Sequence, residues 1–326
     1  PHVRTEPLGG LRPRRRSGRS GSRGPGGHSM SDHTVDLDER RARVVVGPAG
    51  LQGLLDSGRP LTILDVRWAL GRSDGRAQYE SAHVPGAVFV DLETELAGPA
   101  SPAAGRHPLP GLEALQDSAR SWGVRRGVPV VVYDDVSGMS AARAWWLLRW
   151  AGVDDVRILD GGLSAWRARG GAVESGDVVV PESSVVLTPG HMPVVDADEA
   201  QRVAATGVLL DARAGERFRG EVEPVDPRAG HVPGAVSLPT AGNLDASGRT
   251  LAPEALLDRF VAAGVLSGVP HLAAGEDQQL AVYCGSGVTA SHQVAVLASL
   301  GIDAALYPGS WSQWSNDPER PAAVGA

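Results

Sequence analysis

The chain lacks lysine and contains a single cysteine, and each scarcity excludes a class of chemistry. All 31 basic residues among its 326 are arginine, so no mechanism that needs a lysine amine is open to it. Cys284 cannot form an intramolecular disulfide, and a lone thiol does not make a cysteine-built zinc site. No stretch approaches the roughly 18 consecutive apolar residues of a membrane span. We therefore expect a soluble protein of a reducing compartment, the cytoplasm, with no membrane partner and no metal.

The formal net charge is −7, but it is distributed unevenly along the chain. Residues 1–29 carry seven arginines and one glutamate, so the remainder from Met30 onward carries −13. An acidic body of this kind disfavours nucleic acid as a partner. The first 29 residues are rich in glycine, serine and arginine and lack the apolar core of a secretory signal. We predict a disordered tail at residues 1–40. A nucleic-acid-binding arm, a transit-type peptide and non-native sequence are its candidate origins, and we favour the last.

The sequence contains an internal duplication with a nearly constant offset. His-Val-Pro-Gly-Ala-Val stands at residues 83–88 and again at 231–236, which is 148 residues later. Three further matches occur in the same order, at offsets of 146 to 150 residues: 64–67 with 210–213, 132–134 with 282–284, and 160–166 with 308–314. Solenoid repeats run to only ~20–50 residues, so a period this long indicates two tandem copies of one domain.

Within each copy, short apolar runs alternate with amphipathic stretches. This pattern predicts an α/β fold in which each copy forms a mainly parallel sheet with helices on both faces. The predicted strands are residues 61–66, 128–133, 207–211 and 280–283, and the predicted helices are 140–150, 254–265 and 290–300. The predicted parts are a first domain at 41–170, a linker at 171–192 marked by glycine, proline and serine, a second domain at 193–318 and a C-terminal tail at 319–326.

The two copies differ most where their Val-Tyr strands end. The first copy continues as DDVSGMSA from Asp134, and the second continues as CGSGVTA from Cys284. The ends of these loops correspond, but a carboxylate begins one and a thiol begins the other. Features shared by both copies are attributed to the fold, and a feature of one copy is a candidate for function. Ligands of parallel α/β sheets bind at the carboxyl ends of strands, which is where Cys284 is placed.

The loop that follows Cys284 favours a negatively charged sulfur. Gly285 and Gly287 let the backbone curl so that its N–H groups point inward as an anion-binding nest. A helix predicted to start near Thr289 adds its positive end. We therefore expect the pKa of the thiol to lie below its ordinary ~8.5. A lone cysteine is more often a buried core residue, but a core residue does not need a Gly-Ser-Gly loop.

Two other cysteine chemistries fit the sequence less well. Cysteine phosphatases carry an arginine six positions after the cysteine, and that position is Ala290. A papain-like Cys–His pair is disfavoured because backbone dipoles, and not a neighbouring base, would ionise this thiol. His292 lies eight residues beyond the cysteine, and this spacing carries no argument.

The chain resembles the tandem-domain rhodanese sulfurtransferases, which include the thiosulfate and 3-mercaptopyruvate enzymes, over residues 44–318. The matching motifs are LDVRW, SAHVPGAVFVDL, ARAWWLLRWAG and LDGGLSAW in the first copy and LLDAR, RFRGEVEP, GHVPGAVSLPT, YCGSGVTAS and YPGSWSQW in the second. The resemblance implies a persulfide on Cys284, a catalytically inactive first domain, a catalytic second domain and an active site between them, without a metal or an organic cofactor.

The loop sequence indicates the subfamily. Mercaptopyruvate-type members carry Cys-Gly-Ser-Gly-Val-Thr, as at residues 284–289, whereas thiosulfate-type members carry Cys-Arg-Lys-Gly-Val-Thr. The resemblance assigns substrate binding to the loop residues Gly285, Gly287, Val288 and Thr289. Because this loop has no cationic side chain, the carboxylate of a keto acid needs arginines from elsewhere. The family's substrate arginine maps to Arg217, for which the alternative is a surface ion pair with Glu216 or Glu221, and the nearest candidate for a second is Arg228.

Mercaptopyruvate-type members also use a Ser–His–Asp relay. The resemblance assigns it to Ser286, His107 and Glu93, with a glutamate where the family has an aspartate, and Asp91 is the alternative. Residues present in both copies are interpreted as structural. These are His83 with His231, Asp65 with Asp211, and Arg67 with Arg213.

The main hypothesis is a sulfurtransferase that moves sulfane sulfur from 3-mercaptopyruvate, through a Cys284 persulfide, to a thiol or cyanide. The expected partners are a small anionic sulfur donor and a thiol acceptor such as thioredoxin. Two alternatives stay open at this point. Thiosulfate is the donor in one, and in the other the chain is a non-catalytic rhodanese-type module that binds or carries sulfur.

Overall fold

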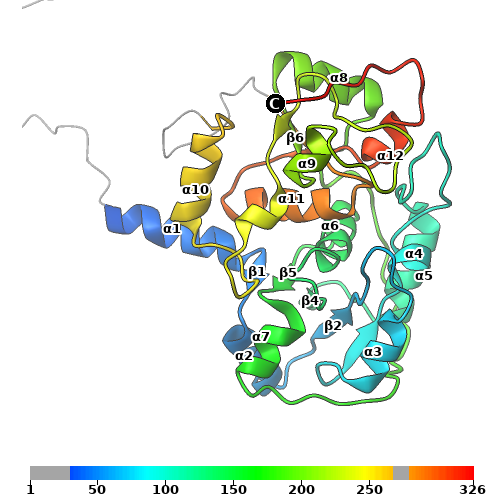
Figure 1. The fold of residues 1–326 in the computed structure, drawn as a ribbon. Coiled ribbons are helices and arrows are strands. Elements are labelled where there is room, and N and C mark those ends of the chain that lie inside the picture. Colours follow the sequence, from blue (N-terminus) through cyan, green and yellow to red (C-terminus); the bar gives the residue numbers. More distant parts are fainter. Residues whose placement is uncertain (1–29, 267–278) are drawn as a thin grey trace, which may run out of the picture.

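The computed structural model describes residues 30–266 and 279–326, which form two α/β domains (Figure 1). The first domain contains a five-stranded sheet in the order β1-β5-β4-β2-β3, and the second a four-stranded sheet in the order β7-β6-β8-β9. Every pair of neighbouring strands is parallel. The strands are β1 (Val45–Val46), β2 (Thr62–Asp65), β3 (Ala87–Phe89), β4 (Val130–Tyr133), β5 (Val156–Leu159), β6 (Val208–Asp211), β7 (Val236–Ser237), β8 (Leu280–Tyr283) and β9 (Ala305–Leu306). The predicted fold class is confirmed.

Helices surround both sheets. The first domain contributes α2 (Pro48–Asp56), α3 (Gly75–Ser81), α4 (Leu92–Glu95), α5 (Leu112–Ser121), α6 (Ala141–Trp150) and α7 (Gly162–Ala168). The second contributes α8 (Ala197–Thr206), α9 (Gly215–Phe218), the 3₁₀ helix η1 (Thr240–Asn243), α10 (Pro253–Ala262), α11 (Val288–Ser299) and α12 (Ser310–Trp314). All four residues of β2, β4, β6 and β8 are buried, as the apolar runs predict for strands covered on both faces.

The two copies keep the same register. Asp65 of β2 pairs with Tyr133 of β4, and Asp211 of β6 pairs with Tyr283 of β8. The helices that follow β4 and β8, namely α6 and α11, pack against each other at the centre of the molecule (Figure 1). One hydrophobic core contains buried residues of both helices. The loops that precede these helices each lie against the other domain: Gly138 lies next to His292 of α11, and the carbonyl of Gly287 accepts from Arg143 of α6.

The residues that both copies share are structural, as predicted. Asp65 and Arg67 form a buried ion pair at 2.6 Å, and Asp211 and Arg213 repeat it at 2.6 Å. In the same way, Nδ1 of His83 lies 2.9 Å from the carbonyl oxygen of Tyr79, and Nδ1 of His231 lies 2.8 Å from that of Phe218.

The predicted disorder of residues 1–40 is wrong for the part from Met30, which forms helix α1 (Met30–Ala42). Arg41 at its end donates to Asp160 Oδ2 at 2.9 Å and to the carbonyl of Leu251 at 2.7 Å, so it contacts both domains. Leu37 packs against the hydrophobic core. Composition could not reveal these anchors because their partners lie more than a hundred residues away. Residues 1–29 lie outside the described part of the chain.

The predicted linker, residues 171–192, contains no helix or strand. It is attached to the first domain by a bridge between Glu174 and His83. Residues 319–326 pack back on the second domain, since Ala323 pairs with His231 and the carbonyl of Pro321 accepts from Trp314 Nε1 at 2.8 Å. The C-terminal segment is thus bound to the second domain over its length and is not a free tail.

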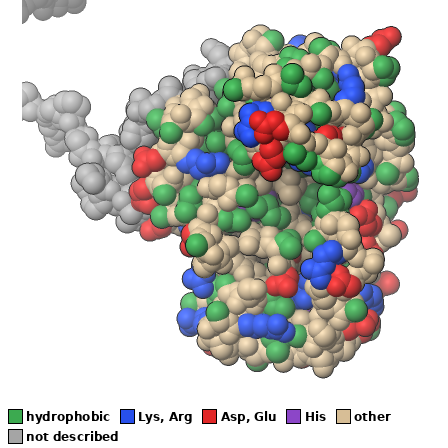
Figure 2. All heavy atoms as spheres, in the orientation of Figure 1, with side chains coloured by type: hydrophobic (Ala, Val, Ile, Leu, Met, Phe, Trp, Pro, Cys, Tyr) green, Lys and Arg blue, Asp and Glu red, His purple; other side chains and the backbone are tan. Residues whose placement is uncertain are grey.

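No helix in the described ranges combines the length and the apolar composition that a membrane crossing needs. On the face seen in Figure 2, arginines and acidic side chains are interspersed among apolar and neutral ones. That face presents no broad field of one sign.

Candidate active site

Cys284 is the first residue after strand β8 and begins a tight loop into helix α11. Its sulfur accepts a hydrogen bond from the N–H of Gly287 at 3.1 Å. Gly287 has φ of 80°, and a Cβ at this position would lie 2.6 Å from the carbonyl oxygen of Pro308, so only glycine fits. Helix α12 supports the loop from the other side, where the N–H of Trp311 donates to the carbonyl of Cys284 at 3.0 Å. The loop therefore turns the N–H of Gly287 toward the sulfur.

The cysteine is covered in this arrangement. Its exposed fraction is 1%, and its neighbours include the apolar core that α6 and α11 share. The side chains nearest to Gly285 are two arginines. A Cβ on Gly285 would lie 3.0 Å from Arg106 Nη2 and 3.4 Å from Arg217 Nη1. The guanidinium groups of one residue from each domain thus border the loop that carries the thiol.

The corresponding loop of the first domain holds a carboxylate in its nest. Asp134 is fully buried, and its two oxygens accept hydrogen bonds from four backbone N–H groups of its own loop at 2.8 to 2.9 Å. The donors are Val136, Gly138, Ser140 and Ala141. Burial raises the pKa of Asp134, and the four N–H groups oppose this rise. This loop type is therefore an anion-binding nest, and in the first domain it is filled by its own side chain.

The predicted relay residues lie together at the contact between the domains. His107 comes from the segment between α4 and α5, and its Nδ1 lies 2.7 Å from the hydroxyl oxygen of Ser286. Its Nε2 lies 3.2 Å from both carboxylate oxygens of Glu93, at the start of α4. Asp91, the alternative, accepts from the N–H groups of Glu93 and Thr94 and caps α4. The geometry thus brings Ser286, His107 and Glu93 into one hydrogen-bonded series.

The surroundings of His107 favour its neutral form. Its burial lowers its pKa below 6.5, and the charge of Glu93 partly opposes this shift. Trp68 completes the arrangement. Its indole N–H donates to Glu93 Oε1 at 2.7 Å, and its ring stands edge-on to the His107 ring with centroids 5.4 Å apart. Trp68 belongs to the LDVRW motif, but nothing in the sequence indicates that it orients the glutamate.

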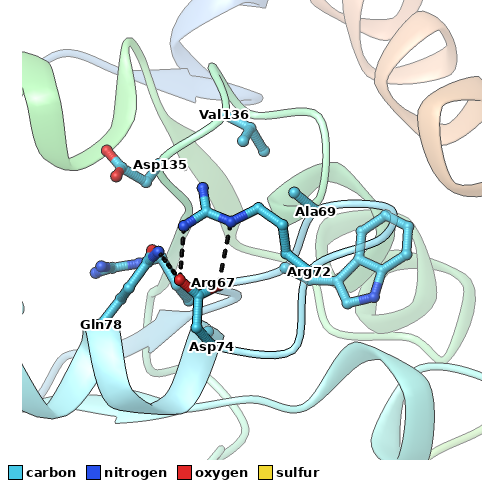
Figure 3. A pocket seen from close by; sticks show the side chains of 9 residues that line it. Arg67, Ala69, Arg72, Asp74, Gln78, Asp135 and Val136 are labelled. Carbon is cyan, nitrogen blue, oxygen red and sulfur yellow. Dashed lines mark hydrogen bonds and ion pairs between the residues drawn. The ribbon is translucent and has the colours of Figure 1, made fainter.

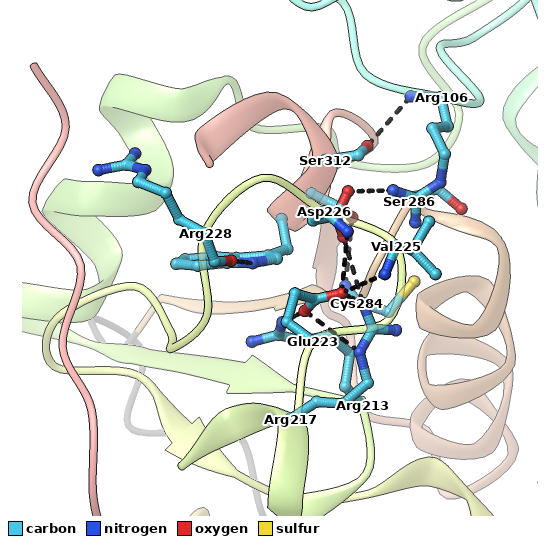
Figure 4. A network of polar contacts seen from close by, with 12 residues as sticks. Arg106, Arg213, Arg217, Glu223, Val225, Asp226, Arg228, Cys284, Ser286 and Ser312 are labelled. Atoms are coloured by element: carbon cyan, nitrogen blue, oxygen red, sulfur yellow. Dashed lines mark hydrogen bonds and ion pairs between the residues drawn. The ribbon is translucent and has the colours of Figure 1, made fainter. Parts of the chain in front are cut away.

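Arg217 lies beside the active loop, as predicted, but its partners differ from the expected ones. It donates to Glu223 Oε1 at 2.6 Å and to Asp226 Oδ2 at 3.2 Å, and not to Glu216 or Glu221 (Figure 4). Both partner carboxylates are buried, with side chains 4% and 2% exposed.

The assignment of Arg228 to substrate binding is not supported by its contacts. Its guanidinium donates to the carbonyls of four residues near the C-terminus at 2.6 to 2.9 Å, and Figure 4 shows it directed away from Cys284. These acceptors are Trp314, Ser315, Asp317 and Arg320. All three nitrogens of the group are used to hold that segment, so Arg228 is structural.

Two functional candidates were missed from the sequence. Arg106 precedes the relay histidine, pairs with Asp226 across the domain contact and has a buried Nε without a described partner. Arg143 of α6 is fully buried and donates to the carbonyls of Leu96, His107 and Gly287. Burial lowers the pKa of Arg143 to about 10, and the neighbouring Cys284 opposes this shift. Nothing along the chain distinguishes these two from the other 29 arginines.

The first domain differs at the place that corresponds to Arg217. At the corresponding position, Arg72 and Asp74 form two hydrogen bonds beside Asp135 and line a pocket of only about 30 Å³ (Figure 3). Both side chains of this pair are 53% exposed. His292 is buried, and its Nδ1 lies 2.7 Å from Thr240 Oγ1 and not from Cys284. In the described ranges, no three histidine, cysteine or acidic side chains converge as a metal site requires.

Comparisons with known proteins all indicate the same family. The model of the rhodanese-like domain matches residues 48–169 and 196–317. A Mycobacterium tuberculosis protein that carries the name thiosulfate sulfurtransferase SseB is 47% identical over 88% of this chain and 99% of its own length. A Pseudomonas aeruginosa protein that carries the name 3-mercaptopyruvate sulfurtransferase is 46% identical over 81% and 93%.

Solved structures agree with this result. The structure of SseA from Escherichia coli superposes with a TM-score of 0.70 at 34% identity and covers 82% of this chain and 98% of its own. The 3-mercaptopyruvate sulfurtransferase of Leishmania major gives a TM-score of 0.71 at 29% identity over 84% and 74%.

Proposed function

Because the chain belongs to the rhodanese family of sulfurtransferases, we propose that Cys284 takes a sulfur atom from 3-mercaptopyruvate as a persulfide and passes it to a thiol or to cyanide. In this proposal the first domain, residues 41–170, is catalytically inactive but supplies side chains to the active site. The second domain, residues 193–318, carries the nucleophile.

The observation that carries the choice of donor is the series Ser286–His107–Glu93. Thiosulfate already contains a sulfane sulfur and leaves as sulfite, so its reaction needs no proton relay. Mercaptopyruvate leaves as an enolate, which must be protonated at carbon. Ser286 lies two residues from the nucleophile, and a neutral His107 is suited to exchange its proton. The relatives at 46–47% identity carry names for both donors, and the relay supports 3-mercaptopyruvate.

The proposed transfer of sulfur to Cys284 conserves atoms and electrons without a cofactor. The thiolate of Cys284 attacks the donor sulfur, the S–S bond forms, and the C–S bond breaks with its electron pair on the departing carbon. The proton of the donor thiol passes through Ser286 and His107 to that carbon, which gives pyruvate and a persulfide anion. A thiolate or cyanide then attacks the outer sulfur and restores the thiolate.

The first domain suggests how the persulfide is held. A carboxylate oxygen of Asp134 and the outer sulfur of a persulfide on Cys284 both stand two bonds beyond Cβ. The four N–H groups around Asp134 therefore mark where loop N–H groups of the second domain would stabilise the outer sulfur. The predicted roles of Gly285, Gly287, Val288 and Thr289 are proposed on this ground, through their backbone and not their side chains.

The donor must reach a cysteine that is only 1% exposed. Arg106 and Arg217, the side chains next to the loop, are 26% and 17% exposed, so they form the accessible surface nearest to Gly285. We propose that the donor carboxylate binds these two arginines and that their movement admits its thiol to Cys284. A small dithiol protein of the thioredoxin type is the proposed acceptor, and the cytoplasm the proposed location, because the unpaired thiol must stay reduced.

Mass spectrometry of the full chain tests the proposal. After incubation with 3-mercaptopyruvate and removal of excess donor, the protein should gain the mass of one sulfur atom, and peptide mapping should locate it at Cys284. Cyanide should remove the added mass and release thiocyanate. Cys284→Ser is the matched control and should gain nothing. A wild-type protein that stays unmodified with either donor would exclude a sulfurtransferase that works through Cys284 and would favour the binding module.

A further inference from the structure

Six charged side chains form a series of alternating sign that runs from the first domain to the end of β6. In order they are Arg106, Asp226, Arg217, Glu223, Arg213 and Asp211. After the first link, the N–O distances along this ion series are 3.2, 2.6, 3.4 and 2.6 Å. Three guanidinium groups balance three carboxylates, so the ion series is neutral as a whole.

The end of the ion series that borders the active loop consists of two arginines that share one carboxylate. Asp226 accepts from Arg106 through Oδ1 and from Arg217 through Oδ2, and its side chain is only 2% exposed (Figure 4). Glu223, by contrast, forms ion pairs with Arg217 and with Arg213. Asp226 is therefore the one carboxylate of the ion series that pairs with both cations next to Gly285.

These arginines still have donors to offer. Arg106 Nη2 and Arg217 Nη1 are the nitrogens nearest to the position of a Cβ on Gly285, and neither donates to any residue in the described ranges. A ligand over the loop would thus find two directed N–H groups backed by a buried negative charge. Such a site can bind one carboxylate through hydrogen bonds, but it supplies little net charge to offset the desolvation of a second negative charge.

We infer that Asp226 sets the charge class of the sulfur donor, so that the enzyme accepts monoanions with a single carboxylate and disfavours dianions. This inference rests on the proposed function and adds a residue that determines its specificity. Asp226 does not touch the reacting atoms. It acts by holding Arg106 and Arg217 and by offsetting one of their two positive charges.

The test compares two donors in one variant. Asp226→Asn removes the negative charge but keeps an oxygen acceptor. With cyanide as acceptor, the ratio of kcat/KM for thiosulfate to kcat/KM for 3-mercaptopyruvate should rise by about tenfold or more, because the added unit of positive charge favours the dianion over the monoanion. Asp226→Glu keeps the charge and should keep the wild-type ratio. Glu221→Gln is the control for an equal charge change, since Glu221 pairs with Arg219 and both are largely exposed.

Inhibition of the wild-type enzyme gives a second measurement that needs no variant. Pyruvate, a monoanion, should compete with 3-mercaptopyruvate with an inhibition constant at least about tenfold below that of sulfate, a dianion. Equal inhibition by the two anions would overturn the inference. So would an Asp226→Asn variant that loses both donors in equal proportion, because that result describes a purely structural carboxylate. Both outcomes leave the proposed function in place as long as the wild-type chain forms its persulfide.

Discussion

Asp134 and Cys284 occupy the same position in the two domains, and each accepts a hydrogen bond from the equivalent glycine of its loop. Gly138 donates to Asp134 Oδ1 at 2.8 Å, and Gly287 donates to Cys284 Sγ at 3.1 Å. In the first domain the nest is permanently occupied by a buried carboxylate. In the second domain this position carries a shorter side chain, with one heavy atom beyond Cβ. We call the carboxylate-filled nest of the first domain the closed form of the site.

The closed form should contribute strongly to stability. Replacing Asp134 by Ala leaves four buried N–H groups without an acceptor, and we expect the free energy of unfolding to fall by about 3 kcal/mol. Urea denaturation followed by tryptophan fluorescence measures the change. For Asp135→Ala, at the exposed neighbouring position, the free energy of unfolding should fall by less than about 0.5 kcal/mol. Equal losses in the two variants would show that the nest does not depend on its anion.

The relay should matter more for one donor than for the other. Ser286→Ala and His107→Gln should each lower kcat/KM for 3-mercaptopyruvate by about 10²- to 10⁴-fold, because the enolate then lacks its proton source. Sulfur transfer from thiosulfate should be affected far less. His191→Gln, at an exposed histidine whose Nε2 lies 3.0 Å from Thr188 Oγ1, is the matched control. If both donors lost rate equally in Ser286→Ala, the serine would serve the nest and not proton transfer.

The pH dependence follows from the lowered pKa of His107. The relay needs neutral imidazole, so kcat/KM for 3-mercaptopyruvate should decrease as the pH falls through a midpoint below 6.5. The charge of Glu93 raises the pKa of His107 and thus partly offsets the effect of burial. Glu93→Gln should therefore move the acid limb to lower pH while it reduces the maximal rate. A midpoint that moved to higher pH in this variant would contradict the contact between the two side chains.

Arg217 and Arg228 should behave differently although they are only eleven residues apart. Arg217→Ala should raise KM for 3-mercaptopyruvate by about 10- to 100-fold, the cost of a lost charge-assisted hydrogen bond. Arg228→Ala should leave KM unchanged but destabilise the fold, since four carbonyls of the C-terminal segment lose their donor. Steady-state kinetics and thermal melting of both variants measure this contrast. A rise of KM in Arg228→Ala would show that Arg228 binds the substrate after all.

Much of this site could be predicted because the duplication serves as a control. Comparison of the copies identified Cys284 as the exception and assigned His83 and His231 to the fold, where the structure places them. The relay residues followed from the resemblance, which also favoured Glu93 over Asp91. Helix α11 was expected to start near Thr289 and begins at Val288, because the glycine loop ends there.

The site residues that the sequence did not reveal are placed by contacts between the domains. Arg106 lies 120 residues from Asp226, and Arg143 lies 144 residues from Gly287. A sequence with 31 arginines gives no local sign of which guanidinium lies beside the thiol. Arg228 was chosen because it is close to Arg217 along the chain, and the packing of the C-terminal segment removes it from the site. Spacing along the chain is a poor guide to residues that meet across a domain boundary.

Arg143, inside helix α6, bonds to backbone on both sides of the contact between the copies, and this has a consequence for how the molecule could have evolved. His107, Glu93 and Arg106 all belong to the first domain, so the proposed mechanism needs that domain although it carries no cysteine. Neither half expressed alone would contain a whole catalytic centre. The pair is therefore inherited as a single indivisible unit, even though each half retains the outline of an independent ancestor.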